Sequence, residues 1–425
     1  MNYTRYLNCV SLARKPSPIR AITALLARAP PSVISLAGGM PNPSMFPFES
    51  AEIKLRDGTK LELTEPKMKT ALQYGPTQGY APLVSWIKDM VKSLHNPPTF
   101  DRPANDGGLE ICITPGCQDG LCKAFEMLVQ KDDNVLIDSP TYPGTLGALR
   151  PLGCNLIGVE TDHQGMKPVA LKEALSRWQP SDSENPDSDI PRLLYTIPNG
   201  VNPTGASLTF DRKKEIYDIA REYNLLILED DPYYFLQYKE KTPSFLSLDE
   251  DGRVLRFDSF SKVLSSGLRL GFVSGPQPLI QRIILHLMVS SMHTTSMTQV
   301  LAHELLQQWG MEGYKEHLEK VVRFYESQKN AMMSSAEKWL SGLAEWSEPQ
   351  AGMFIWFKIK GISDTKRLIE EKAVAKEVMF VPGISFMVDD TKPTPFVRAA
   401  FSIATPEQID QGLQRLALLI KEELQ

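Results

Sequence analysis

The sequence predicts an α/β protein with a large, mostly parallel sheet sandwiched by helices, followed by a small α+β domain. Five short apolar runs alternate with helix-spaced segments between residues 109 and 228, which is typical of a parallel sheet. One of them, Leu225–Leu228, reads LLIL, as expected for a strand buried on both faces. Two later runs extend the set to seven strands. The runs are Leu109–Thr114, Asn134–Ile137, Asn155–Val159, Leu193–Ile197, Leu225–Leu228, Val254–Phe257 and Leu270–Val273.

The segments between and after these runs predict the helices. Helical spacing between the first five runs covers Gln118–Val129, Gly144–Leu152, Val169–Trp178 and Arg212–Tyr223. Two further helical segments follow the last strand, at Pro278–Trp309 and Tyr314–Leu343. The tail interleaves strand-like Glu345–Ile359, Met379–Val381 and Val397–Ser402 with helical Asp364–Lys376 and Pro406–Leu424. We therefore expect an N-terminal arm over residues 1–48, a large domain over 49–310 and a small domain over 311–425.

Composition narrows the classes of function. With 425 residues, 42% of them hydrophobic, the chain can bury a large core. A net charge of -5 gives no electrostatic reason to expect nucleic acid or a lipid surface as partner. No run approaches the roughly 18–20 apolar residues of a membrane span. The five cysteines lack the paired spacing of metal ligands, so we expect no metal.

The N-terminal 48 residues contain no acidic residue, and their basic residues lie in a background of serine and alanine. The basic residues are Arg5, Arg14, Lys15, Arg20 and Arg28. This composition is typical of a transit peptide, and the alternative is a basic structural arm. The segment Ala21–Ala29 has helical composition between two prolines, so a lid that carries Arg20 over a site is a third interpretation.

A lysine follows the sixth predicted strand in the run Asp258-Ser-Phe-Ser-Lys262. Alone, such a lysine is most often a solvated surface group. Near a desolvated cationic site, however, it becomes a neutral amine that attacks a carbonyl carbon. Ser259 and Ser261 could donate to a phosphate, and Arg269 could supply its positive charge.

Three other strand ends carry polar residues. Asp230 follows LLIL, where ligands bind in α/β sheets, although an acid there also caps helices. Asn202 stands in the turn NPTG after Leu193–Ile197. A glycine turn before Cys117 and Gln118 starts a helix whose free N–H groups favour an anion. Each signal is weak alone, because turns of these kinds are common.

Together the motifs resemble the fold-type I pyridoxal-phosphate aminotransferases. They come in the order NPTG, DxxY, SxSK followed by GLRLG, and a late arginine in FVRAAFS. The opening stretch ISLAGGMPNPSMFP also resembles that family, and the likeness extends over essentially the whole chain. The resemblance implies the cofactor pyridoxal 5'-phosphate, a homodimer with shared active sites, and small-molecule amino acids and 2-oxo acids as partners.

The resemblance also implies a role for each matching residue. Lys262 bonds covalently to the cofactor and moves the substrate proton, while Asp230 pairs with the ring nitrogen. Asn202 and Tyr233 bond the ring oxygen, and Tyr142 stacks on the ring. The implied phosphate ligands are Ser259, Ser261, Arg269, the amides of Cys117 and Gln118, and Tyr74 of the neighbouring subunit. The implied substrate contacts are Arg398 at the α-carboxylate, with Gly39, Tyr74, Tyr142, Asn202, Phe354 and, at the far end, Arg20.

One position departs from the family pattern. Cys117 stands where a hydroxyl residue is usual, which puts a side-chain role there in doubt. The expected reaction moves the amino group of L-kynurenine, L-2-aminoadipate and related L-amino acids to 2-oxoglutarate or another 2-oxo acid. The expected location is the mitochondrial matrix, with the cytosol as alternative. One rival function is a lyase on the same fold, since the cofactor site alone does not fix the reaction type. A less favoured rival is a ligand-sensing regulator with an aminotransferase-like domain, because such proteins carry a DNA-binding module ahead of that domain and the opening motif here starts at Ile34.

Overall fold

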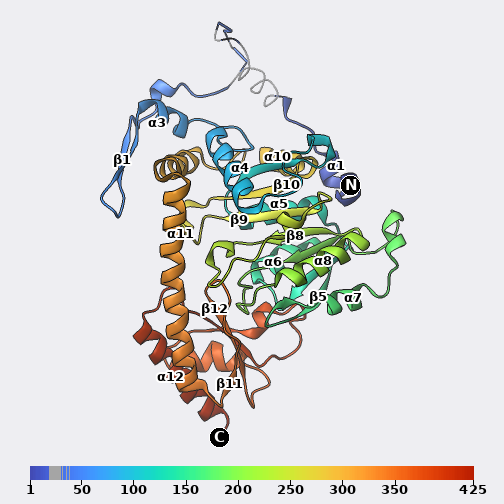
Figure 1. Ribbon diagram of the computed structural model, residues 1–425, viewed down its shortest axis with the longest axis vertical. Helices are drawn as coiled ribbons and strands as arrows, with labels where there is room; N and C mark the ends of the chain where they lie inside the picture. The colour runs from blue at the N-terminus through green and yellow to red at the C-terminus, as the bar shows by residue number, and fades with distance from the viewer. Residues whose placement is uncertain (19–29, 31, 35, 38) are drawn as a thin grey trace. The chain divides into compact units, whose positions relative to one another are not determined.

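The computed structural model describes residues 1–18, 30, 32–34, 36–37 and 39–425 (Figure 1). Arg20 and the predicted helix Ala21–Ala29 therefore lie outside the described residues. The chain divides into two compact units, and each unit takes two stretches of sequence. Unit 1 comprises Met1–Val129 and Asp249–Tyr314, and unit 2 comprises Gln130–Leu248 and Lys315–Gln425. The division into an arm, a large domain and a small domain stays a prediction.

The sheet of unit 1 contains three strands in the order β3-β10-β9. β10 (Gly271–Pro276) runs antiparallel to both β3 (Leu109–Thr114) and β9 (Val254–Ser259). Every residue of β9 and β10 is buried, as their apolar composition predicts. α5 (Cys117–Leu128) and α10 (Gln277–Ser290) pack against β10. The three strands predicted for this part of the chain are confirmed.

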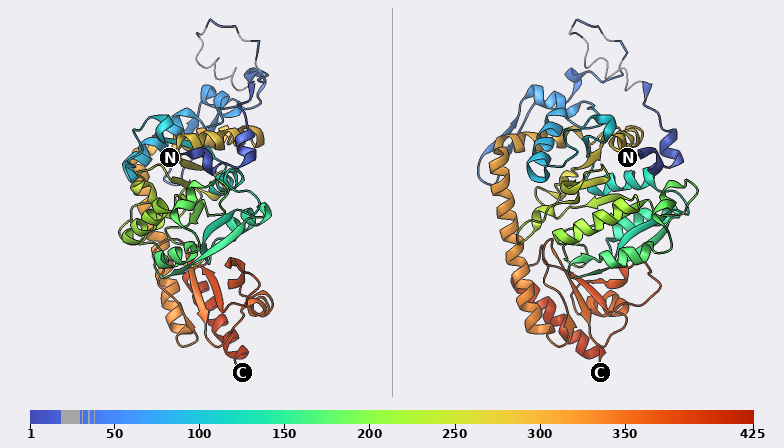
Figure 2. Two further views of the ribbon diagram at one scale, coloured as in Figure 1. Left: turned by 90° about the vertical axis from the view of Figure 1, so that its right-hand side faces the viewer. Right: turned by 45° about the vertical axis from the view of Figure 1, so that its right-hand side comes forward.

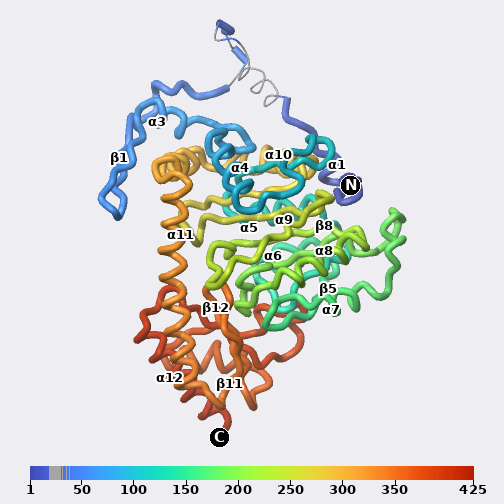
Figure 3. The backbone as a smooth tube through the Cα atoms, viewed as in Figure 1, coloured from blue at the N-terminus to red at the C-terminus, as the bar shows by residue number. Residues whose placement is uncertain are grey.

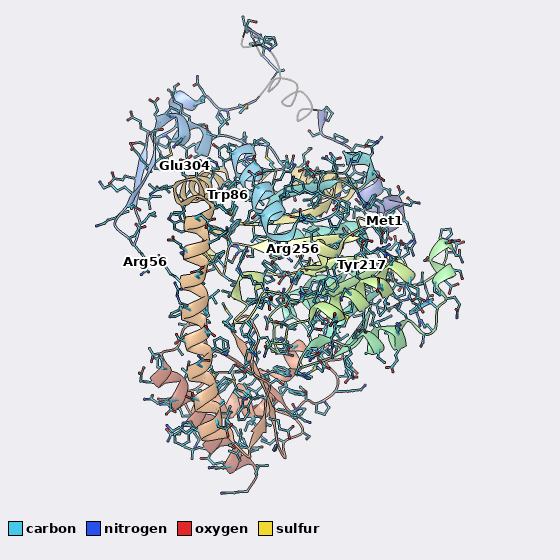
Figure 4. The ribbon with its side chains drawn as sticks, in the orientation of Figure 1. Met1, Arg56, Trp86, Tyr217, Arg256 and Glu304 are labelled. Carbon is cyan, nitrogen blue, oxygen red and sulfur yellow. The ribbon has the colours of Figure 1, made fainter. Side chains whose placement is uncertain are left out.

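Unit 1 also contains two strands and two helices that the sequence patterns did not predict. These are β1 (Ala51–Lys54), β2 (Lys60–Leu63), α3 (Glu65–Leu72) and α4 (Ala81–His95). The strands form an antiparallel hairpin, which Figure 3 traces beside α3, and Figure 4 labels Arg56 at its tip. Leu63 packs with Met68 and Val300 in a small apolar cluster. The base of the hairpin is therefore held by burial, while its tip is exposed.

The first residues of the chain are built into unit 1. Tyr3 and Tyr6 are buried. Asn8 caps α1 (Cys9–Ala13) through its side-chain oxygen, and its Nδ2 donates to the Val129 carbonyl (2.8 Å). Removal of this segment would expose apolar surface and leave carbonyls without their donor, so its packing favours the structural-arm interpretation for these residues.

Replacing Asn8 with alanine should lower the free energy of unfolding by about 2 kcal/mol, because a helix cap and two further hydrogen bonds are lost. A thermal melt would record this as a lower Tm. The matched control is Val10→Ala on the same helix, since Val10 is 54% exposed and should cost less than about 0.5 kcal/mol. Equal melting of the two variants would show that the segment is only loosely attached.

The main sheet of unit 2 has the strand order β8-β7-β4-β5-β6. Its strands are β4 (Asn134–Ser139), β5 (Asn155–Asp162), β6 (Gly165–Met166), β7 (Leu193–Thr196) and β8 (Leu226–Asp230). The four longer strands are parallel, as predicted, and β6 pairs antiparallel with β5. The predicted helices are α6 (Pro143–Leu149), α7 (Pro168–Leu175) and α8 (Phe210–Glu222). Because the long strands are parallel, their carboxyl ends share one edge, where ligands bind.

A second, antiparallel sheet in unit 2 has the order β11-β12-β14-β13. The strands are β11 (Ala344–Glu345), β12 (Phe354–Ile359), β13 (Val381–Pro382) and β14 (Phe396–Ala400). Figure 2 shows the C-terminal helix α12 (Pro406–Glu423) in this part of the unit. Its Asp410 accepts hydrogen bonds from Lys338 and Trp339 of α11 (2.9 Å each), which fixes α12 to the preceding helix.

The helices after β10 agree with the prediction at one break and differ from it at another. The predicted helix Pro278–Trp309 is interrupted, because α10 ends at Ser290 and helical structure begins again at Ser296. The label α11 (Ser296–Leu340) covers two helices that meet at a kink at Gly310, φ 61°, which lies in the predicted gap between Trp309 and Tyr314. The predicted helix Asp364–Lys376 contains a π-helical turn at Leu368–Ala373. Among the described helices, none is long and apolar enough to cross a membrane. The described residues also include no cluster of three acidic, histidine or cysteine side chains that could hold a metal ion.

Candidate active site

Lys262 lies in unit 1, in the turn that follows β9. Burial lowers the pKa of the Lys262 ammonium from its ordinary value, and the positive charge of Arg269 lowers it further. Both effects favour the neutral amine, which is the form that attacks a carbonyl carbon. Ser259 shapes the turn, because its Oγ accepts from the Ser261 N–H (3.2 Å).

Arg269 and the start of α5 form a place for an anion within unit 1. The Arg269 guanidinium donates to Ser261 Oγ (3.4 Å) and to the Pro115 carbonyl (3.3 Å), so its charge lies beside the turn before α5. Gly116, the N-cap residue of α5, has φ 85°, and a side chain there would collide with Arg269. A helix N-terminus, a guanidinium and a serine hydroxyl are donors that bind phosphate. This donor set fits the phosphate of the cofactor that the resemblance implies.

Cys117 and Gln118 are the first two residues of α5. The Cys117 side chain is buried. A side chain at Gly271 of β10 would come within 2.8 Å of the Cys117 nitrogen, so glycine there lets the helix N-terminus approach the strand. A main-chain role for Cys117 and Gln118 stays a prediction.

Tyr74 lies on a loop of unit 1 beside an open cavity of about 330 Å³. Tyr74 is 50% exposed, and its ring meets the His293 ring edge-on with centroids 6.1 Å apart. His293 Nε2 accepts from the Gly75 N–H (3.3 Å), and its Nδ1 bonds the Thr294 carbonyl (2.7 Å). His293 thus holds the loop that carries Tyr74, a contact that no sequence motif marked. The reach of Tyr74 into a neighbouring subunit stays a prediction.

Asp230 is the last residue of β8 in unit 2. Its side chain is buried, and the Tyr195 hydroxyl donates to its Oδ2 (2.6 Å). Tyr195 lies on β7 and accepts in turn from Thr145 Oγ1 (2.8 Å). The sequence motifs predicted a role for Asp230 but gave none to Tyr195 or Thr145. The available signal was a tyrosine inside a buried apolar strand, since its hydroxyl needs a partner there.

Arg398 of β14 and Asn202, which follows β7, meet in unit 2. Arg398 Nη1 donates to Asn202 Oδ1 (3.0 Å), and the guanidinium lies over the Phe354 ring, 4.4 Å from its centroid. The buried Nε of Arg398 has no hydrogen-bond partner in the part of the chain that the structure describes. A buried donor left unpaired costs about 1–3 kcal/mol. A ligand carboxylate would supply the partner in a bidentate pair.

Tyr233 and Tyr142 belong to the same group of side chains. Tyr233 is buried, and its ring meets Phe354 edge-on with centroids 6.0 Å apart. Burial lowers the pKa of Arg398, and electrostatic interaction with Tyr233 and then Tyr142 opposes that shift. Because Asn202 uses its oxygen for Arg398, its Nδ2 is the atom that can donate to a ligand.

Each unit therefore brings together part of the predicted site. Unit 1 contains Tyr74, Cys117, Gln118, Ser259, Ser261, Lys262 and Arg269. Unit 2 contains Tyr142, Asn202, Asp230, Tyr233, Phe354 and Arg398. Gly39 is exposed, with open space around it among the described residues, so its predicted place beside the substrate stays a prediction.

The α/β fold and these side chains indicate an enzyme that binds a phosphate-bearing cofactor and a carboxylate substrate. The sequence model of the family "Aminotransferase class I and II" matches residues 45–416. The chain belongs to this family, and the predicted family and fold class are confirmed.

Individual relatives resemble the chain over its full length. It is 55% identical over 425 residues to "Kynurenine/alpha-aminoadipate aminotransferase, mitochondrial" of Mus musculus, with 100% of each chain covered. The crystal structure of aminotransferase Aro8 from Candida albicans is similar with a TM-score of 0.88 and 27% identity, over 100% of this chain and 99% of that one. The Pyrococcus horikoshii kynurenine aminotransferase, in complex with PMP, has a TM-score of 0.77 and 29% identity over the same shares.

Proposed function

We propose that this chain is a pyridoxal-phosphate-dependent transaminase that moves the amino group of L-kynurenine, L-2-aminoadipate and related L-amino acids to 2-oxoglutarate or another 2-oxo acid. The observation that carries the proposal is the environment of Arg398. Its guanidinium lies next to Asn202 and Phe354, and its buried Nε has no hydrogen-bond partner among the described residues. Every amino acid and 2-oxo acid brings the α-carboxylate that would complete this arginine. The printed name of the mouse relative supports the choice of substrates.

The proposed work of unit 1 is to hold the cofactor phosphate and to present the reactive amine. Ser261, Arg269 and the N-terminus of α5 bind the phosphate, together with Ser259. The lowered pKa of Lys262 serves two roles. The same Nζ forms the covalent link to the cofactor and later accepts the α-proton of the substrate. Pyridoxal 5'-phosphate supplies, when bound, a ring that accepts electrons from the substrate α-carbon.

The proposed work of unit 2 is to control the ring and to orient the substrate. The Asp230 carboxylate holds a proton on the ring nitrogen. When the cofactor is bound, Asn202 Nδ2 and the Tyr233 hydroxyl would donate to the ring oxygen, and Tyr142 would stack on the ring face. Arg398 binds the α-carboxylate and so points the α-hydrogen in one direction for every substrate.

The remaining contacts are proposed from the family resemblance. A homodimer contributes Tyr74 of one subunit to the phosphate of the other, and Gly39 and Phe354 line the substrate. The predicted role of Arg20 at the far carboxylate of 2-aminoadipate falls on a residue outside the described ones. The names of close relatives support a mitochondrial location.

A substrate panel tests the proposed function. Purified protein is loaded with pyridoxal 5'-phosphate and incubated with L-kynurenine or L-2-aminoadipate, with and without 2-oxoglutarate. We expect both donors to be consumed in multiple turnovers only when the 2-oxo acid is present. Consumption of more than one equivalent per active site without an acceptor would support the alternative, a lyase on the same fold.

Replacing Arg398 with alanine should raise KM by about 30-fold or more for every amino acid and 2-oxo acid tested, because truncating a buried charge partner costs roughly 2–5 kcal/mol. Steady-state kinetics over the panel measure the effect. The control is Arg367→Ala, which removes an exposed arginine of the same unit and should leave KM unchanged. Loss confined to dicarboxylic substrates would instead place Arg398 at the side-chain end.

A further inference from the structure

We propose that Tyr195 is a positioning residue for Asp230, and that Thr145 orients the Tyr195 hydroxyl toward it. The inference rests on the proposed function, in which Asp230 holds the proton of the ring nitrogen. It adds a chain of three hydrogen-bonded side chains behind that carboxylate. No motif or spacing in the sequence links Thr145 to Tyr195 or Tyr195 to Asp230.

The geometry of the chain is direct. Thr145 Oγ1 donates to the Tyr195 oxygen (2.8 Å), and the Tyr195 hydroxyl donates to Asp230 Oδ2 (2.6 Å). Because the tyrosine oxygen already accepts a proton from Thr145, its own proton points to the carboxylate. Thr145 and Tyr195 are 0% exposed and Asp230 is 3% exposed, so bulk water does not compete for these bonds.

The sheet fixes this contact. Tyr195 on β7 pairs with Leu228 on the parallel neighbour β8. Asp230 lies two residues beyond Leu228, and side chains two residues apart point to the same face of a sheet. The Tyr195 ring therefore spans from its own strand to the end of the next one, and the backbone register determines its reach.

A hydrogen bond from Tyr195 has two effects on Asp230. It stabilises the ionised form, since a charge-assisted O–H···O bond favours the carboxylate over the neutral acid. It also fixes the rotation of the carboxylate, because one oxygen is committed to the phenol. Only an ionised and oriented carboxylate can hold a proton on a ring nitrogen.

A second buried acid strengthens the argument. Asp138 on β4 accepts from the Ile197 N–H (2.8 Å) and from Thr196 Oγ1 (3.2 Å). Burial raises the pKa of Asp138 to about 7, and the negative charge of Asp230 contributes to that rise. Two neighbouring buried acids oppose each other's ionisation. A hydrogen bond to one of them therefore favours ionisation of that acid. The Tyr195 bond stabilises the charged form of Asp230.

The test is Tyr195→Phe, which keeps the ring and removes only the hydroxyl. Holoenzyme is prepared with pyridoxal 5'-phosphate that carries nitrogen-15 in its ring, and the nitrogen resonance reports ring protonation directly. We expect the resonance to shift toward the unprotonated position. We also expect kcat to fall about 10- to 100-fold while KM for L-2-aminoadipate changes by less than about 3-fold, because a hydrogen bond to a charged group is lost and Arg398 is untouched.

Two further variants serve as the control and the reference for Tyr195→Phe. Tyr217→Phe makes the same change at a buried tyrosine of α8, labelled in Figure 4, and should leave resonance and kcat unchanged. Asp230→Asn removes the carboxylate itself, so it gives the largest expected change in the nitrogen resonance and in kcat. If Asp230→Asn moves the resonance and Tyr195→Phe does not, the inference is overturned and the proposed function stands. If Asp230→Asn moves neither quantity, the proposed role of Asp230 has failed and the inference falls with it.

A third variant covers a failure to fold. If Tyr195→Phe is unfolded by circular dichroism, Thr145→Val replaces it, because valine keeps the shape of threonine and removes its donor. We expect a shift of the nitrogen resonance in the same direction and of smaller size. A resonance at the wild-type position in folded Thr145→Val protein would overturn the inference.

Discussion

Lys262→Ala should reduce turnover by about 1,000-fold or more, because the variant loses both the nucleophile and the group that moves the α-proton. The reason lies in the environment of the amine. Burial and the charge of Arg269 lower the pKa of Lys262, so folding shifts the amine toward its neutral form. Alanine supplies no group that can take either role.

The measurement for Lys262 is the absorption spectrum of the holoenzyme together with turnover of L-2-aminoadipate. The covalently bound cofactor should give wild-type protein a visible absorption band that Lys262→Ala lacks. Lys172→Ala, at an exposed lysine of α7, should keep both the band and the turnover. Near-normal turnover of Lys262→Ala would show that Lys262 has no role in the mechanism.

Asp230→Asn should slow exchange of the substrate α-proton by about 100- to 1,000-fold while the cofactor still binds, because the buried carboxylate that holds the ring-nitrogen proton becomes a neutral amide. The phosphate donors of unit 1 are unchanged in this variant. If the variant retains the cofactor, its slower exchange reflects the weaker electron-accepting ability of the ring and not a loss of cofactor binding.

Exchange of the α-hydrogen for deuterium, followed by proton NMR, measures the effect of Asp230→Asn. The matched control is Asp231→Asn, the next residue in the chain, whose carboxylate accepts from the Asn199 side chain (2.8 Å). That control should lower Tm and leave exchange far closer to wild type. A loss of folded structure in Asp230→Asn, seen by circular dichroism, would make Asp230 structural instead.

The fold was predictable where one local pattern decided it. The strand β8 reads as LIL plus two acids and lies in the run LLIL, and an apolar run of that length between turn residues is typical of a buried strand. The hairpin of β1 and β2 escaped prediction because its four-residue strands are largely charged and exposed. In β2 only Leu61 and Leu63 are buried. Two leucines are too few to reveal the alternation of apolar and polar residues that marks a strand.

By itself the sequence determined which chemical groups stand at the strand ends. Asn202, Asp230 and Lys262 each follow a buried run, and the ends of such strands are where α/β proteins bind ligands. That information is local, since it needs only the residue type and its position after an apolar run.

Only the tertiary structure decided which groups touch. Arg398 and Asn202 are separated by 196 residues and share a hydrogen bond, while Tyr195 meets Asp230 across two strands. His293 likewise holds the loop of Tyr74 from a distant segment. Such contacts depend on strand register and on the packing of segments far apart in the chain, which no short pattern encodes. For that reason the sequence identified the acid at the end of β8, and the fold revealed the tyrosine that orients it.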